Sequence, residues 1–154
     1  MSFNPNQFRE VIRCTLKECD ERILSHSAVE LLMMTAAQET HLGTYLYQDD
    51  GDVEIENHLA AGIFQIESIT FYDILERIVI PSYPGFKQCK FVDLITDIKL
   101  SILIARFKYW SVPEKLPEPD DISGLALYYK KYYNTYKGKA QISEVIINYE
   151  RFCR

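Results

Sequence analysis

Apolar side chains recur at helical spacing along most of this chain, and this periodicity constrains its fold more than any other feature. In residues 91–110 they form one stripe, which consists of Phe91, Leu94, Ile95, Ile98, Ile102, Ala105 and Tyr109. The same spacing, or a run of strong helix formers, predicts further helices over 8–24, over 31–39, up to Ile78, over 125–133 and up to about Phe152. We therefore expect a mainly α fold, with one short β-hairpin within residues 44–66.

The ends of one predicted helix can be assigned from single residues. Ser27 and Glu30 have the spacing of a capping box, in which the serine caps the helix and the glutamate bonds back to the N–H of the cap residue. Gly43 ends the same helix. Residues 44–60 then form a polar, acidic segment, and a loop of that length is usually functional or mobile.

The size and charge of the chain exclude several classes of protein. A chain of 154 residues predicts a single domain over residues 1–154, which we expect to be a monomer. The formal net charge of -5 argues against general nucleic-acid binding, which needs a surplus of Lys and Arg. The apolar runs are too short for a membrane span of about 18 residues. The first residues show no secretory signal, so we expect synthesis in the cytoplasm.

Cysteine and histidine spacing favours neither a metal site nor a nucleophile. The four cysteines contain no CxxC pair, so we interpret them as reduced thiols: Cys14, Cys19, Cys89 and Cys153. A cysteine nucleophile would be Cys89, but no local signature supports it. His26, His41 and His58 lack the HExxH spacing of zinc enzymes, so we expect no metal and no cofactor. His41 is either a surface residue or part of a cleft near Glu39.

Glu39 has the clearest chemistry in the sequence. It follows the very apolar segment 31–37, and a carboxyl group among apolar neighbours loses hydration, which raises its pKa. The partial negative charge at a helix C-terminus acts in the same direction. A carboxyl group that stays protonated near neutral pH is the general acid that cleavage of a glycosidic bond requires. The alternative is a solvated glutamate at a helix end.

Three short motifs occur in a fixed order: Glu39-Thr40, then Gly62-Ile-Phe-Gln65-Ile66, then Tyr133-Asn134. Together they resemble the lysozyme-like superfamily that contains soluble lytic transglycosylases and goose-type lysozymes. In that family a catalytic glutamate ends a helix, a Gly-x-x-Gln turn follows, and a Tyr-Asn pair lies near the last helices. The resemblance spans roughly residues 30–136. It implies a lysozyme-like domain that cleaves the β-1,4 bond between N-acetylmuramic acid and N-acetylglucosamine in peptidoglycan glycan strands.

The resemblance also implies roles for individual residues, with Glu39 as the general acid. Gly62 would let the backbone approach the substrate closely, and Gln65 would hydrogen-bond an acetamido or hydroxyl group of the sugar. Tyr133 would hydrogen-bond the catalytic carboxyl group, while Asn134 would hold the loop or the sugar. The alternatives are a turn glycine, an exposed glutamine and a packed tyrosine.

Hydrolysis needs a second carboxylate, whereas a lytic transglycosylase uses one glutamate as acid and then as base and forms a 1,6-anhydro product. Goose-type lysozymes carry acidic residues near the positions of Asp52 and Glu67, which are therefore the candidates. The family more often has Asp at the position of Glu67. We expect hydrolysis, with transglycosylation as the alternative. Other carboxylates of the same loop are Asp49, Asp50, Glu54 and Glu56.

Residues 128–139 are basic and rich in tyrosine. We interpret them as a wall on which sugars stack, with lysines facing the anionic cell wall, rather than as a single-stranded nucleic-acid site. Helical spacing supports the alternative of a core-facing side formed by Tyr129, Tyr132, Tyr133 and Tyr136.

Two alternatives without catalysis remain, a glycan-binding module and a structural protein with accidental motifs. As an enzyme without an export signal, the chain would act on the bacterial wall after release from the cell, or within a phage particle or secretion machine. Small phage endolysins and virion-borne lysozymes are the analogous proteins.

Overall fold

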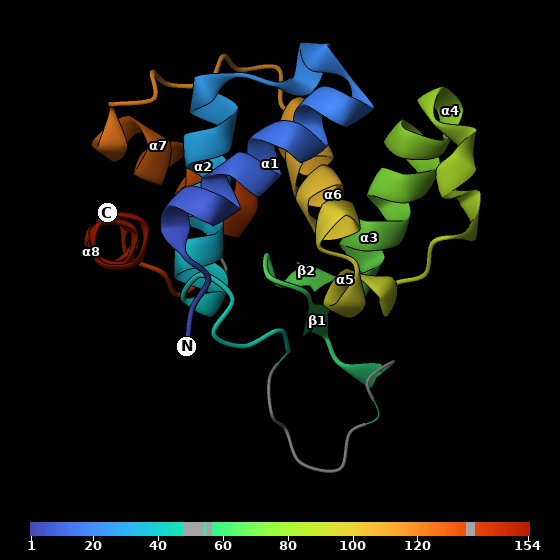
Figure 1. The fold of residues 1–154 in the computed structure, drawn as a ribbon, viewed down its shortest axis with the longest axis horizontal. Helices are drawn as coiled ribbons and strands as arrows, with labels where there is room; N and C mark the ends of the chain where they lie inside the picture. The colour runs from blue at the N-terminus through green and yellow to red at the C-terminus, as the bar shows by residue number, and fades with distance from the viewer. Residues whose placement is uncertain (48–53, 55–56, 135–137) are drawn as a thin grey trace.

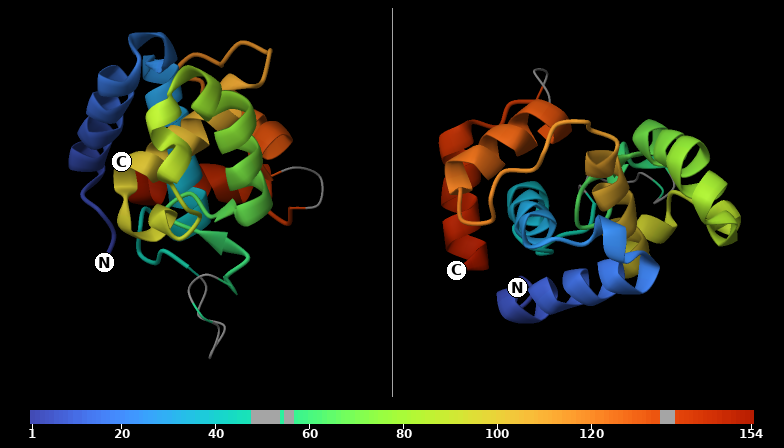
Figure 2. Two further views of the ribbon diagram at one scale, coloured as in Figure 1. Left: turned by 90° about the vertical axis from the view of Figure 1, so that its right-hand side faces the viewer. Right: turned by 90° about the horizontal axis from the view of Figure 1, so that it is seen from above.

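Helix α2 (His26–Thr40) runs through the middle of the molecule, and four other helices pack around it (Figure 1). The computed structural model describes residues 1–47, 54, 57–134 and 138–154. The right-hand view of Figure 2 shows the surrounding helices on different sides of α2. Each of them contacts α2: α1 (Pro5–Cys19), α6 (Ile98–Trp110), α7 (Ile122–Tyr129) and α8 (Ile142–Cys153). The predicted mainly α fold is therefore confirmed.

The central place of α2 follows from its composition, because a helix that is apolar on all sides must be buried. Ten of its 15 residues are buried. The helix begins after Ser25, whose hydroxyl accepts a hydrogen bond from the N–H of Ala28 at 3.0 Å. The predicted capping box is wrong, since Ser27 lies inside the helix. Glu30 instead accepts hydrogen bonds from Arg9 of α1 at 2.7 and 3.1 Å, a charge-assisted pair that a cap could not match.

The helix predicted over 91–110 is divided in two. Helix α5 (Asp93–Thr96) ends at Asp97, whose backbone is extended with φ -109° and ψ 98°. The Asp97 carboxylate accepts a hydrogen bond from the N–H of Leu100 at 3.0 Å and so caps α6. Aspartate competes with the backbone inside a helix and favours a cap, which explains the break. The single apolar stripe is also wrong, because residues 100–107 are all buried.

The remaining helical segments are short or continue a longer one. The predicted helix over 8–24 ends at Cys19 and is followed by a 3₁₀ turn. The helix predicted to end at Ile78 continues to Ser82 through a π-helical turn, and a second π-helical turn extends α7. These segments are a 3₁₀ turn at Glu21–Ile23, α3 (Ser68–Ile74), a π turn at Leu75–Val79, α4 (Ile80–Ser82), a 3₁₀ turn at Pro84–Gln88, and a π turn at Lys130–Asn134.

Two short strands form the predicted hairpin. Strand β1 (Ala60–Ala61) pairs antiparallel with β2 (Ile66–Glu67), which extends one residue past the predicted segment. The turn between them requires glycine at position 62, where φ is 78°. A Cβ atom there would lie 2.6 Å from the carbonyl oxygen of Leu94 and from the hydroxyl of Ser101.

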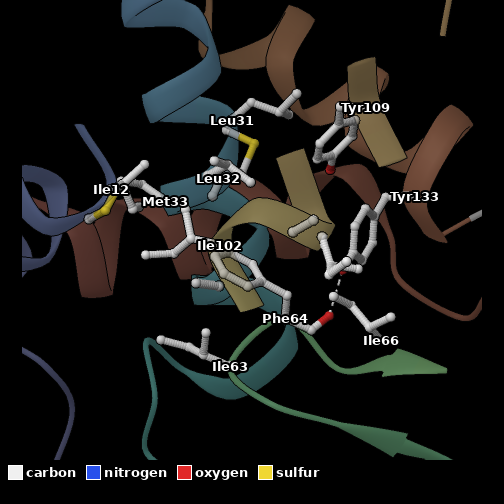
Figure 3. Close-up of a cluster of buried hydrophobic side chains, with 14 of the residues drawn as sticks. Ile12, Leu31, Leu32, Met33, Ile63, Phe64, Ile66, Ile102, Tyr109 and Tyr133 are labelled. Carbon is white, nitrogen blue, oxygen red and sulfur yellow. Dashed lines mark hydrogen bonds between the residues drawn. The ribbon is translucent and has the colours of Figure 1, made fainter. Parts of the chain in front are cut away.

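The apolar side chains form one contiguous core. Phe64 from the hairpin turn reaches into it beside residues of α2 and α6, as Figure 3 shows. The four cysteines are free thiols. Within the part of the chain that the structure describes, no helix has the length and apolar character needed to cross a membrane.

Candidate active site

Glu39 is the penultimate residue of α2, and its side chain is half-buried. Its Oε1 accepts a hydrogen bond from the hydroxyl of Tyr129 at 2.6 Å. Burial raises the pKa of Glu39 from its ordinary 4.5 to about 7, although the Tyr129 hydrogen bond and the nearby charge of Lys108 lower it. A carboxyl group with that pKa can both donate and accept a proton near neutral pH. The raised pKa expected from the sequence is therefore present.

The C-terminal end of α2 is hydrogen-bonded to the hairpin turn that begins at Gly62. The hydroxyl of Thr40 donates to the carbonyl of Ile63 at 2.7 Å and accepts from the N–H of Gly43 at 3.0 Å. On the other side, the hydroxyl of Tyr133 donates to the carbonyl of Phe64 at 2.8 Å (Figure 3). Residues of the first and third motifs thus hold the turn formed by the second. These bonds fix the position of the turn relative to Glu39.

A cleft of about 400 Å³ lies beside Glu39. Five of the seven predicted site residues line it, although they lie far apart in the sequence and come from four different segments. The lining consists of Glu39, Gln65, Glu67, Thr70, Lys108, Tyr133, Asn134 and Gly138.

Gln65 lines the cleft, and its side-chain amide is held by two hydrogen bonds. Its amide nitrogen donates to the carbonyls of Gly62 at 2.9 Å and Leu46 at 3.2 Å, which fixes the direction of the side chain. Its Oε1 is buried and accepts no hydrogen bond from the described residues. A buried acceptor without a partner costs about 1–3 kcal/mol, so a small turn of the amide that brings this oxygen to a ligand N–H or O–H in the cleft would be favourable.

Lys108 of α6 adds a cation to the lining of the cleft. Its ammonium donates to the carbonyl of Tyr133 at 3.2 Å and lies 3.9 Å from the centre of the Tyr133 ring. Burial lowers the pKa of Lys108, while the carboxylates of Glu39 and Glu67 raise it. Glu67, at the end of β2, is exposed at the rim of the cleft. The ammonium is therefore close enough to act electrostatically on both carboxyl groups.

Two of the predicted roles are wrong. Tyr133 does not contact the Glu39 carboxyl group, because its hydroxyl is used by Phe64; the contact comes from Tyr129, one turn earlier. Gly62 is buried, and its close approach is to the backbone of Leu94 rather than to the cleft.

The other predicted residues have different outcomes. Asn134 lines the cleft, and its Oδ1 accepts a hydrogen bond from the ammonium of Lys130 in the same π turn at 2.8 Å. His41 stacks on Phe152 of α8, with ring centres 4.9 Å apart, and does not line the cleft. Glu54 is exposed. Outside the described residues lie Asp52 and its neighbours Asp49, Asp50 and Glu56.

Sequence reasoning missed Tyr129 and Lys108 as site residues. Tyr129 precedes Tyr133 by four residues, so helical spacing could have suggested it as an alternative partner for Glu39. Lys108 lies in a helix whose preceding residues are nearly all buried, and a lysine in such a segment is itself a signal of function or pairing.

The tyrosine-rich segment belongs mainly to the core. Tyr128, Tyr129 and Tyr133 are exposed by only 7%, 0% and 7%. The sugar-stacking interpretation is wrong for Tyr128 and Tyr129, which do not line the cleft, whereas Tyr133 does line it. Tyr132 is partly buried, and Tyr136 lies outside the described residues.

In residues 1–47, 54, 57–134 and 138–154, no group of three or more His, Cys, Asp or Glu side chains is arranged to hold a metal ion. Comparisons with protein-family models, curated proteins and solved structures give no match. The functional assignment therefore depends on the chemistry of the cleft.

Proposed function

We propose that this protein is a glycosidase that cleaves the β-1,4 bond between N-acetylmuramic acid and N-acetylglucosamine in peptidoglycan, with Glu39 as the general acid. The observation that carries the proposal is the Glu39 carboxyl group, which has a pKa of about 7 and lies beside an open cleft. A general acid works best when its pKa is close to the working pH, because it must hold its proton and still release it.

In the proposed reaction each oxygen of Glu39 has a separate task. Oε1 accepts the hydrogen bond from Tyr129, so Oε2 is the oxygen that carries the proton. Transfer of that proton to the glycosidic oxygen breaks the bond, and positive charge develops on the anomeric carbon. The Tyr129 hydrogen bond persists after the transfer and stabilises the carboxylate that forms.

Gln65 and Glu67 complete the proposed reaction. Gln65 lines the cleft, and its amide is the group proposed to hydrogen-bond the acetamido group of the sugar next to Glu39, once the side chain turns its buried Oε1 toward the cleft. Glu67 is the described carboxylate available to activate water or attack the sugar. Asp52 remains a second candidate for this role.

Transglycosylation is the second candidate function, and the exposure of Glu67 favours it. Glu39 is the one half-buried carboxyl group among the described residues that line the cleft, and a transglycosylase needs no other. In that reaction Glu39, once deprotonated, would take the proton from the 6-hydroxyl of the same muramic acid residue.

Digestion of purified peptidoglycan, followed by mass spectrometry of the products, tests both reactions. We expect soluble fragments with reducing ends, whereas 1,6-anhydro ends as the main product would assign transglycosylation. Glu39→Gln should lower the rate about 10²- to 10⁴-fold, the usual contribution of a general acid. Glu76→Gln, an exposed carboxylate outside the cleft, is the matched control and should digest like the wild type.

Two results would contradict the proposal. Full activity of Glu39→Gln would remove Glu39 from the reaction. Binding of glycan by the wild type without any release of fragments would instead indicate a glycan-binding module, and no binding at all would indicate a structural protein.

A further inference from the structure

A second and larger cavity, of about 570 Å³, lies at the opposite end of α2 from Glu39. Its walls come from the residues just before and at the start of α2, from the end of α6, and from the loop between α6 and α7. Figure 1 shows the start of α2 and the end of α6 together at the top of the molecule, whereas the β-hairpin lies near the other end of α2. None of the residues proposed to act in catalysis lines this cavity.

Arg106 is the charged group built into the wall of this cavity. Arg106 is only 4% exposed. No carboxylate among the described residues forms an ion pair with its guanidinium. Its Nε donates to the carbonyl of Ile23 at 2.7 Å, and its guanidinium lies 5.1 Å from the centre of the Trp110 ring. The four N–H groups of its two terminal nitrogens donate to no described residue. These nitrogens are not among the fully buried polar atoms without a partner, so they are accessible from the cavity that Arg106 lines and can pair with an anion there.

The acidic side chains near the cavity do not serve as that anion. Glu114 and Glu118 line the same cavity, but both are exposed, and Glu118 lies 3.7 Å from Lys115. Burial lowers the pKa of Arg106 to about 10, and the group that acts against this is the Tyr128 hydroxyl rather than a carboxylate. Arg106 therefore stays charged at neutral pH, and no carboxylate among the described residues forms an ion pair with it.

The start of α2 adds a second feature that favours an anion. Ser25, the cap residue, and Ser27 of the first turn both line the cavity. The first N–H groups of a helix carry a partial positive charge and have no acceptor within the helix. The rest of the wall includes apolar side chains, namely Leu24, Trp110, Val112 and Leu116.

We propose that this cavity is a binding site for an oxyanion, a carboxylate or a phosphate, which pairs with the free N–H groups of Arg106 and the start of α2. The planar fork of an arginine matches two oxygens of either group. An apolar or aromatic part of the same ligand would lie against Trp110. The site is independent of the proposed glycosidase activity.

Trp110 makes the test direct, because it is the one tryptophan of the chain and contacts Arg106. Its fluorescence is measured while inorganic phosphate or cyclohexanecarboxylate is added at constant ionic strength, with chloride as the reference anion. We expect a saturable change in roughly the millimolar range with at least one of the two probes. A response to phosphate alone would identify a phosphate ligand, and a response to the carboxylate alone would identify a carboxylate ligand.

Arg106→Leu should weaken this binding roughly tenfold or more, because it removes the charged donors. Arg77→Leu is the matched control, since it removes the same charge from an exposed position outside the cavity. Glu39→Gln should bind the anion like the wild type, so failure of this site and failure of the glycosidase proposal are distinguishable.

Two outcomes would overturn the proposal. One is a change in the wild-type Trp110 fluorescence that is no larger with either probe than with chloride. This result would overturn the proposal even if Arg106→Leu does not fold. The other is an unchanged affinity in a folded Arg106→Leu variant.

Discussion

An ionisable group lies beside each end of α2, and burial shifts the pKa values of these two groups in opposite directions. At the C-terminal end, burial raises the pKa of Glu39 to about 7, which makes it a proton donor and acceptor near neutral pH. At the N-terminal end, burial lowers the pKa of Arg106 to about 10, which leaves it charged. Loss of water penalises the charged form in both places.

The difference between the two ends comes from the ordinary pKa of each group. A carboxyl group starts at 4.5, and a moderate upward shift brings it to neutral pH. A guanidinium starts at 12.5, and a comparable downward shift does not. The same physical effect therefore yields a group suited to proton transfer at one end and a permanent cation suited to binding at the other. The partial charges of α2 also disfavour the charged form of both groups, because the negative C-terminal end faces the carboxylate and the positive N-terminal end faces the guanidinium.

The largest expected effect concerns the stability of Glu39→Gln. The native carboxyl group holds its proton up to a pH of about 7 and the unfolded one only up to 4.5, so wild-type stability falls as the pH rises through this interval. Glutamine does not titrate, so the variant should gain up to about 3 kcal/mol of unfolding free energy over the wild type between pH 4.5 and 7. Chemical denaturation at a series of pH values measures the difference. A constant difference would show that Glu39 has an ordinary pKa.

The next effect separates Tyr129 from Tyr133. Wild-type activity should fall about tenfold for each pH unit above 7, as Glu39 loses its proton. Tyr129→Phe removes a hydrogen bond that lowers the pKa of Glu39, so the fall should begin at a higher pH, and the rate at neutral pH should decrease about tenfold. Tyr133→Phe should leave the position of the fall unchanged, since its hydroxyl bonds to Phe64. Identical pH profiles for the two variants would contradict these assignments.

A smaller shift is expected for Lys108→Met. The ammonium lowers the pKa of Glu39 less than the Tyr129 hydrogen bond does, so its removal should move the pH profile upward, but by less than Tyr129→Phe. Lys99→Met removes a lysine outside the cleft, one paired with Glu18, and is the control for net charge. A downward shift of the profile would show that Lys108 does not act on Glu39.

The smallest pH effect is expected at the other end of α2. Arg106 remains charged in the native protein well above neutral pH, so the change in unfolding free energy caused by Arg106→Leu should not vary between about pH 4.5 and 8. Denaturation curves recorded in parallel with those of Glu39→Gln give a direct comparison. A pH dependence in this interval would mean that a second titrating group is coupled to Arg106.

Much of the fold could be predicted, because it depends on short stretches of sequence. Periodicity identified the helices, and the apolar residues before Glu39 indicated a carboxyl group with a raised pKa. Prediction failed where one residue could form either of two alternative interactions. Asp97 divides a continuous apolar pattern by capping a new helix, and Glu30 pairs with Arg9 instead of capping its own helix.

The site was predicted in part for the same reason. The order of the motifs selected Gln65 and Glu67 correctly as neighbours of Glu39 in one cleft. The choice of Tyr129 over Tyr133 depends on how α7 and its π-helical turn face α2, and a difference of one turn decides which hydroxyl reaches the carboxyl group.

The sequence by itself determined the helical class, the short hairpin and the position of an acid at the end of an apolar helix, since each depends on residues close together in the chain. Only the tertiary structure decided which groups surround Glu39. It also decided that Arg106 lies buried at the other end of α2, where none of the described carboxylates pairs with it. Both depend on how helices from distant parts of the chain cross one another. Burial and pairing, which set the pKa of a group, are properties of that packing.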